Sequence, residues 1–146
     1  MSTVVRAWEP GDRCWIVPTW VRSFADYAPW GRRRTLQEHW HVVDRILDSA
    51  STRVSVLCSA SGPTMLHAWC AWDEPSGALH YVYVPPELRG AGLARRVISS
   101  ALGSYPPVLS ATHPWPSSPK QRTSRRFRWD PYPLLALGRE LATAAA

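Results

Sequence analysis

The stretch LHYVYVPPELRGAGLARRVISSAL, from Leu79 to Leu102, changes character three times along its length. It begins inside an apolar run, ALHYVYV at residues 78–84, that predicts a β-strand. The pair Pro85-Pro86 ends this strand, because proline has no backbone N–H to donate to a sheet. From Ala91 onwards the apolar residues recur at helical spacing, and they predict an amphipathic helix that stops at Gly103.

The turn between this strand and this helix, Arg89-Gly90-Ala91-Gly92, is typical of an anion-binding site. Glycine lets the backbone approach a ligand closely, and the first turn of a helix presents N–H groups with partial positive charge. The turn is not a P-loop, because no Lys-Ser or Lys-Thr pair follows the glycines, and it is not the dinucleotide-binding motif, since Arg95 replaces its third glycine. The alternative is a plain corner between a strand and a helix.

Two helices are predicted upstream of this stretch. The turn Pro10-Gly11-Asp12 precedes a helical pattern from about Arg13 to Phe24, but Pro18 interrupts it, so we expect an irregular or two-part segment. The next helix is clearer, because Thr35 and Glu38 form a capping-box pattern ahead of apolar residues at helical spacing. These apolar residues are Leu36, Trp40, Val43, Ile46, Leu47 and Ala50.

The remaining pattern predicts a sheet within one domain. The runs TVVRAW (3–8), RVSVLCSA (53–60), TMLHAWCAW (64–72) and VLSAT (108–112) are further strands beside residues 78–84. We therefore expect one α/β (α+β) domain over residues 1–146, with a basic C-terminal segment over residues 113–146. In that segment a helix is expected from Pro119 to about Arg128, and a short one from about Leu134.

With these elements in this order, the chain resembles the GCN5-related N-acetyltransferase (GNAT) superfamily. The residues Arg89, Gly90, Ala91, Gly92, Leu93 and Ala94 match the R-G-x-G-[LI]-A form that is common there. The resemblance implies a mixed, mostly antiparallel central sheet flanked by helices and splayed at the fourth and fifth strands. It also implies acetyl-CoA (coenzyme A) as cofactor, with its pyrophosphate on the N–H groups of residues 89–94 and its pantetheine along the strand of Val82, Tyr83 and Val84.

Acyl transfer to an amine needs a deprotonated amine, donors for the oxyanion and an acid for the departing thiolate. The superfamily often uses a Glu on a central strand and a Tyr on the helix after the fifth strand, and this sequence has neither. The catalytic candidates are therefore local: Asp130, which follows a run of arginines, Ser110 and Tyr83. Ordinary strand packing is the alternative for Tyr83 and His80, and an ion pair is the alternative for Asp130.

The net charge of the 146-residue chain is +6, and it is concentrated in two clusters, residues 32–34 and residues 120–128. The second cluster contains Lys120, Arg122, Arg125, Arg126 and Arg128. With Phe127 and Trp129 as stacking groups, it predicts contact with a nucleic acid, and a solvated face is the alternative. The motifs TWVRSF, YVYVPPELRGAGLA and WDPYPLL are similar to small bacteriophage proteins that include Mom-type DNA-modifying enzymes, which implies adenine modification with Asp130 in the active site.

Other features narrow the class of protein. The apolar runs are too short to span a bilayer, so we expect no membrane partner and a cytoplasmic location, in the host cytoplasm if the chain is phage-encoded. Without a C-x-x-C pair or histidines at zinc-ligand spacing, no metal site is expected, and we interpret the cysteines as reduced core thiols. The cysteines are Cys14, Cys58 and Cys70. We also expect Trp20, Trp30 and Trp40 in the core.

Three functions stay open at this point. The first is an acetyl-CoA-dependent N-acyltransferase that acts on a small or protein amine. The second is a nucleic-acid-modifying enzyme on the same scaffold, and the third is a scaffold that binds acyl-CoA without turnover. The sequence names neither the acceptor nor the acyl group.

Overall fold

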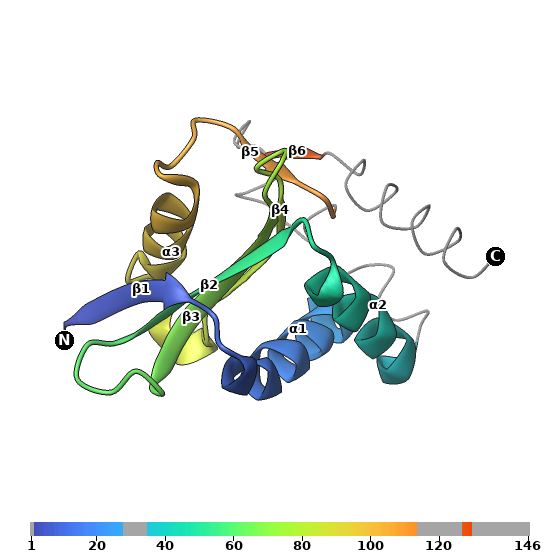
Figure 1. Cartoon of the computed structure of the whole chain (residues 1–146), viewed down its shortest axis with the longest axis horizontal. Helices are drawn as coiled ribbons and strands as arrows, with labels where there is room; N and C mark the ends of the chain where they lie inside the picture. Colours follow the sequence, from blue (N-terminus) through green and yellow to red (C-terminus); the bar gives the residue numbers. More distant parts are fainter. Residues whose placement is uncertain (1, 28–34, 114–126, 130–146) are drawn as a thin grey trace.

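A six-stranded sheet runs through the centre of the molecule in the computed structural model, which describes residues 2–27, 35–113 and 127–129 (Figure 1). The strands follow chain order across the sheet, and the first four pair antiparallel. They are β1 Thr3–Ala7, β2 Thr52–Ser59, β3 Leu66–Asp73, β4 Leu79–Tyr83, β5 Leu109–Ala111 and β6 Phe127–Trp129. The β5 strand lies parallel to both β4 and β6. The predicted mixed, mostly antiparallel sheet is confirmed.

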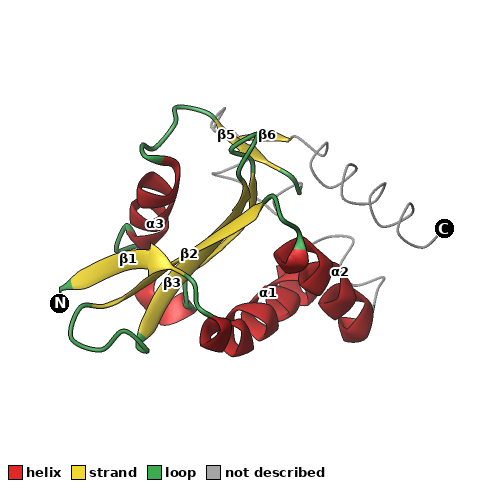
Figure 2. Ribbon diagram, viewed as in Figure 1, coloured by secondary structure: helices red, strands yellow, loops and turns green. Residues whose placement is uncertain are grey.

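Helices cover both faces of this sheet (Figure 2). The helices α1 (Arg13–Tyr27) and α2 (Leu36–Asp48) lie on one face, and α3 (Leu93–Leu102) lies on the other. Each face has its own core. On the first face Trp20 packs against Trp69 at 5.2 Å between ring centroids, and on the second Val97 and Leu79 are fully buried. The sheet is therefore held rigidly between two apolar layers.

The helix α2 begins with the predicted capping box, but its buried face differs from the prediction. Thr35 Oγ1 accepts from the Glu38 N–H, and Glu38 accepts from the Thr35 N–H. The buried residues include His39 and Val43, whereas the Trp40 side chain is 44% exposed, so placing Trp40 in the core was wrong. Trp40 lies instead beside α1, where it lines a pocket together with Pro18 and Val21. Trp20 is a core residue as predicted, and Trp30 lies outside the described residues.

The helix α1 is one continuous element, although the sequence predicted a break at Pro18. Proline removes the bond that residue 18 would donate to the Cys14 carbonyl, four residues earlier. The helix persists because its buried side chains, among them Ile16 and Trp20, are fixed in the core on both sides of the proline. Packing of an amphipathic face outweighs the loss of one backbone bond.

The three cysteines are free thiols, but only two of them are in the core. Cys58 and Cys70 are fully buried, as expected. Cys14 is exposed, so its placement in the core was wrong: it lies on the outer side of α1, where its Sγ bonds the Gly11 carbonyl at 3.0 Å.

The strand β6 corrects the expectation of a basic helix from Pro119 to about Arg128. Phe127 and Arg128 were predicted at the end of a basic helix, but they form a strand that pairs with β5 over three residues. The open edge of β5 provides a backbone partner that a local sequence pattern cannot show. The rest of that predicted helix, and the helix expected from Leu134, lie outside the described residues. Across the part of the chain that the structure describes, no helix has both the length and the apolar character needed to span a bilayer.

We predict that Pro18→Ala stabilises the protein, because alanine restores the missing helix bond and has the highest helix propensity. The free energy of unfolding should rise by about 1 to 3 kcal/mol, reduced somewhat by the greater freedom of the unfolded chain. Urea unfolding followed by circular dichroism measures it. Arg22→Ala, an exposed change in the same helix, is the control and should alter stability by less than about 0.5 kcal/mol. A loss of stability in Pro18→Ala would contradict this account.

Candidate functional site

One edge of β4 leaves its neighbour almost at once. On its inner side β4 pairs with β3 along its whole length, up to Trp69 opposite Tyr83. On its outer side the pairing with β5 consists of one residue pair, Leu79 opposite Ala111. Among the described residues, no other strand pairs with this side of β4 beyond Leu79. A ligand that lay along this side of residues 81–84 as an extra strand would therefore take the place of a strand that the described residues do not supply.

An irregularity in β4 lies at the same place. Trp72 pairs with Leu79, but Ala71 pairs with Tyr81, so His80 is an additional residue in the ladder. Such a bulge bends a strand and redirects its side chains, and bulges are common beside active sites. Here it marks the point at which β4 and β5 part.

The edge of β4 leads directly into the glycine turn. A short 3-10 turn over Pro86–Leu88 follows the strand, and Arg89 Nε donates to the Val84 carbonyl at 3.0 Å. Gly90 and Gly92 have φ of 87° and 77°, values that favour glycine, and Gly92 is the N-cap of α3. A Cβ added to either glycine would meet no protein atom within 4 Å. The turn therefore has open space beside both glycines, and it leads into the first N–H groups of a ten-residue helix.

The predicted cofactor residues are therefore contiguous in space. The residues of the turn, 89–92, are exposed, and Leu93 and Ala94 are half-buried. Val82 and Val84 pack towards the α3 side of the sheet. Their conformation fits the predicted role, and ligand binding itself stays a prediction.

The predicted catalytic residues are not all brought together. Tyr83 is half-buried on the α1 side, where its ring meets Trp15 edge-on at 5.9 Å and stacks on Trp69 at 6.1 Å. Ser110 is half-buried on β5, opposite Arg128 of β6. Asp130 lies outside the described residues, as do the basic residues of the second charge cluster other than Arg128, which is exposed on β6.

A buried polar cluster at the point where β4 and β5 part was missed by sequence reasoning. It consists of His80 on β4 with Thr112 and His113, the two residues that follow β5. Thr112 Oγ1 lies 3.0 Å from Nδ1 of His80 and 3.0 Å from Nδ1 of His113. His113 Nδ1 also lies 3.2 Å from the His80 carbonyl oxygen. Three polar side chains are thus joined across the two strands as they part. The sequence shows only a histidine within one predicted strand and a Thr-His pair at the end of another, and it does not show that they meet.

Burial keeps both imidazoles of this cluster neutral. Desolvation lowers the pKa of His80 to about 4, against a smaller opposing effect of the Asp73 carboxylate. Desolvation likewise lowers the pKa of His113 to about 4, with a further decrease caused by His80. Neutral imidazole has one donor and one acceptor nitrogen, so each ring can take a defined part in a hydrogen-bond chain at neutral pH.

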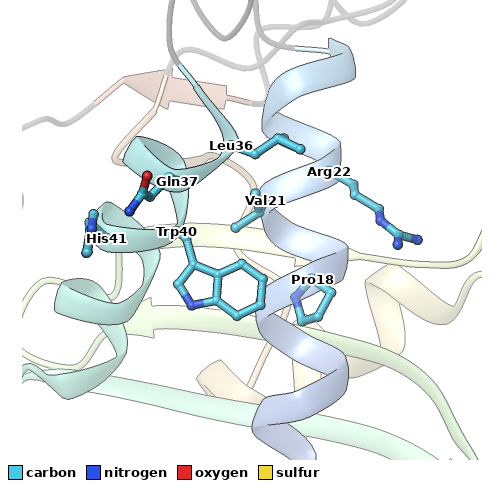
Figure 3. Close-up of a pocket in the computed structure, with 7 residues that line it drawn as sticks. All are labelled: Pro18, Val21, Arg22, Leu36, Gln37, Trp40 and His41. Atoms are coloured by element: carbon cyan, nitrogen blue, oxygen red, sulfur yellow. The ribbon is translucent and has the colours of Figure 1, made fainter.

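A separate pocket of about 510 Å³ lies between α1 and α2 (Figure 3). Its apolar lining comes from Pro18 and Val21 on α1 and from Leu36 and Trp40 on α2, and the Trp40 indole points towards Pro18. The Arg22 guanidinium points away from α2. No residue of β4 or of the glycine turn lines this pocket, so it is distinct from the site predicted from the sequence.

Comparison with known proteins supports the fold. No family model matches the chain, and no curated protein matches it either. Among solved structures, a possible acetyltransferase from Clostridium difficile 630 aligns with a TM-score of 0.52 at 14% identity, over 70% of each chain. This likeness shows that the chain has the fold of that protein.

Two other solved structures align less closely. A spermidine N-acetyltransferase from Vibrio cholerae, in complex with CoA and spermine, aligns with a TM-score of 0.47 at 22% identity over 69% of this chain. The chain spans only 62% of that protein's length. A ribosomal-protein-alanine N-acetyltransferase from Brucella melitensis biovar Abortus 2308 aligns with a TM-score of 0.46 at 14% identity, over 70% of this chain and 71% of that one.

The lowered pKa values of His80 and His113 predict a pH dependence of stability. Between the ordinary value of 6.5 and the folded value of about 4, the unfolded chain binds more protons than the folded one. The free energy of unfolding should therefore fall as the pH falls from about 6.5 to about 4, and it should be level just above that range. Asp12, whose pKa the Arg6 guanidinium holds below 3.8, adds a dependence only at lower pH.

Urea unfolding at a series of pH values measures this dependence. His80→Gln should make the profile shallower, and His41→Gln, a change at an exposed position on α2, should leave it unchanged. A wild-type stability that is flat from pH 6.5 to 4 would contradict the burial of neutral histidines.

Proposed function

We propose that the protein is an acetyl-CoA-dependent N-acyltransferase, which moves an acyl group to an amine by direct attack on the thioester. One observation carries this proposal: the outer edge of β4 leads, through one short 3-10 turn, into a glycine turn at the N-terminus of α3. A pantetheine chain and a pyrophosphate are joined in the same linear order in coenzyme A. The acyl group and the acceptor are not specified by this observation.

The pyrophosphate would lie against the turn of residues 89–94. The αL conformations of Gly90 and Gly92 hold the backbone open, and the space that a Cβ would occupy is free of protein atoms. The N-terminus of α3 contributes partial positive charge, and an anion at such a position is stabilised by direct N–H bonds. Arg89 is exposed beside the turn and adds a full charge. The residues present therefore fit the diphosphate part of the cofactor.

The pantetheine would pair with the edge of β4 over residues 81–84. Pro85 and Pro86 prevent the ladder from continuing beyond it, and β5 has already departed. The Val84 carbonyl already accepts a bond from Arg89, so we assign the binding of the acyl end to the backbone of Val82 and Tyr83. The thioester would then lie beside Val82, Tyr83 and Val84.

Bound acetyl-CoA supplies an activated acyl group as a thioester. The chain's own task is to orient the amine, stabilise negative charge on the carbonyl oxygen and move two protons. A backbone N–H near Val82 is the proposed oxyanion donor. Asp130 is the proposed base for the amine, and the hydroxyls of Tyr83 and Ser110 are the candidate proton donors to the departing thiolate.

A nucleic acid is the second candidate acceptor, and a Mom-like modification of adenine is its specific form. The basic residues between Lys120 and Arg128 support it, together with the position of Arg128, which is exposed on β6 directly opposite Ser110 of β5. A phosphate backbone bound by this segment would bring a base near the open side of β4. A non-catalytic scaffold that binds acyl-CoA is the third candidate, and the absence of the usual Glu and Tyr supports it.

We predict that Gly92→Asp abolishes tight binding of CoA, because it places a carboxylate against the pyrophosphate. Isothermal titration calorimetry should show a loss on the order of 2 to 4 kcal/mol in binding free energy. Gly77→Asp is a matched control, since Gly77 has φ of 68° and equally open surroundings but lies in the turn between β3 and β4. It introduces the same charge and the same backbone strain, and CoA affinity should not change. Equal affinity in a folded Gly92→Asp protein would overturn the site.

We predict for the second candidate that DNA or RNA binding weakens steeply with salt. If about four phosphates are neutralised, the logarithm of affinity should fall against the logarithm of salt with a slope near −3 to −4. Arg125→Ala combined with Arg126→Ala should flatten this slope by roughly 2. The control is Arg22→Ala combined with Arg53→Ala, which removes the same amount of charge elsewhere in the chain and should leave the slope unchanged. No binding at low ionic strength in the presence of CoA would exclude a nucleic acid as acceptor.

A further inference from the structure

The buried cluster of His80, Thr112 and His113 joins β4 and β5 at a point where the two strands have few backbone contacts. The strands share one residue pair, and the Thr112 N–H donates to the Leu79 carbonyl at 2.8 Å. Immediately beyond this bond the strands separate. All three side chains of the cluster are at least nine-tenths buried, with exposed fractions of 3%, 2% and 9%.

The contacts of the cluster assign its protons. The His80 carbonyl can only accept, so the Nδ1 of His113 that lies 3.2 Å from it carries a proton. This N–H also reaches Thr112 Oγ1 at 3.0 Å, and the hydroxyl then accepts from it. The hydroxyl proton can reach Nδ1 of His80 at 3.0 Å and the Leu79 carbonyl at 3.4 Å. The contact with His80 is the shorter of these two, so we assign His80 as the acceptor.

We propose that the His80–Thr112–His113 cluster holds β5 against β4 at the point where they part, and so positions the free edge of β4 for the thioester. In this arrangement His80 is protonated on Nε2 and His113 on Nδ1. The part of the inference that concerns the thioester rests on the proposed function, whereas the joint between the strands does not. These residues act through the backbone of β4 and are positioning residues.

The position of the cluster explains why it acts on the free edge. His80 is the additional residue of the bulge, and Tyr81 and Val82, the next residues of the strand, belong to the edge that has no strand partner among the described residues. A change in how His80 is held rotates the backbone that follows it. Loss of the cluster would let β5 move relative to β4, and the N–H groups of residues 81–84 would lose their fixed direction.

Amide hydrogen exchange tests the joint without any ligand. In Thr112→Val, which keeps the shape of the side chain but removes the hydroxyl, the amide of residue 112 should lose about tenfold in protection. Thr112→Ser restores the hydroxyl and should restore the protection. Thr52→Val removes another buried threonine hydroxyl, on β2, and is the matched control with unchanged exchange at residue 112. Unchanged protection in Thr112→Val would overturn the joint.

Calorimetry with CoA then tests the effect on the edge of β4. Thr112→Val should bind CoA about fivefold more weakly than the wild type, while Thr112→Ser and Thr52→Val should bind like the wild type. Equal binding by Thr112→Val would overturn the positioning role. If the wild type itself binds no CoA, the proposed function fails, and hydrogen exchange still decides whether the cluster joins the strands.

The tautomers provide a test that needs no change at Thr112. In the ¹⁵N spectrum of the imidazoles of the wild-type protein at neutral pH, Nδ1 of His80 should be unprotonated and Nδ1 of His113 protonated. His80→Gln identifies the His80 signals by their loss. The opposite tautomer at either residue would overturn the assignment, even if Thr112→Val did not fold.

Discussion

The separation of β5 from β4 after a single residue pair is the constraint on which the rest of the structure depends. A strand inside a sheet normally satisfies its backbone on both sides, and a buried backbone group without a partner costs free energy. Here one side of β4 is paired with β3, whereas on the other side Leu79 is the one residue with a strand partner among the described residues. The two prolines after β4 prevent the ladder from continuing, and an exposed turn follows them.

The outer edge of β4 has a defined geometry only if the strand itself is held in place. The two apolar cores, one on each face of the sheet, hold it. On the α1 side the ring of Tyr81 stacks on Trp20 at 5.7 Å and lies 5.7 Å from Trp69. On the opposite side Val82 and Val84 pack against the layer that contains Val97. Alternate residues of the same short strand are thus anchored in different layers. The helix α3, which begins at Gly92, belongs to the second layer, so the glycine turn and the strand edge are held in one rigid unit.

The elements that are determined by local chemistry could be predicted from the sequence. The capping box at Thr35 and the helix stop at Gly103 each depend on residues within one helical turn, and each formed as predicted. The central strands followed from β-propensity and turn residues. The order of these elements was sufficient for the fold and for the position of the glycine turn.

The errors arose where distant parts of the chain decide the outcome. Pro18 lies in a continuous helix because its neighbours are fixed by the core, and Trp40 is partly exposed because α2 buries His39 and Val43 in the core instead. The strand β6 forms because β5 presents an edge to it. The cluster of His80 and Thr112 joins residues 32 positions apart, and no periodicity in the sequence indicates that they meet.

The polar cluster of His80, Thr112 and His113 also helps to determine the register of β5 beside β4. A strand of three residues that meets its neighbour at one residue pair has little apolar contact with which to determine its register. A shift by one residue would exchange the two faces of β5, placing Ser110 where Leu109 and Ala111 are buried. Apolar side chains at positions 80 and 112 would tolerate such a shift at small cost, whereas a buried imidazole and hydroxyl lose their partners and incur the full desolvation penalty. The cluster therefore reinforces the register that the burial of Leu109 and Ala111 favours, and this register determines where the two strands part.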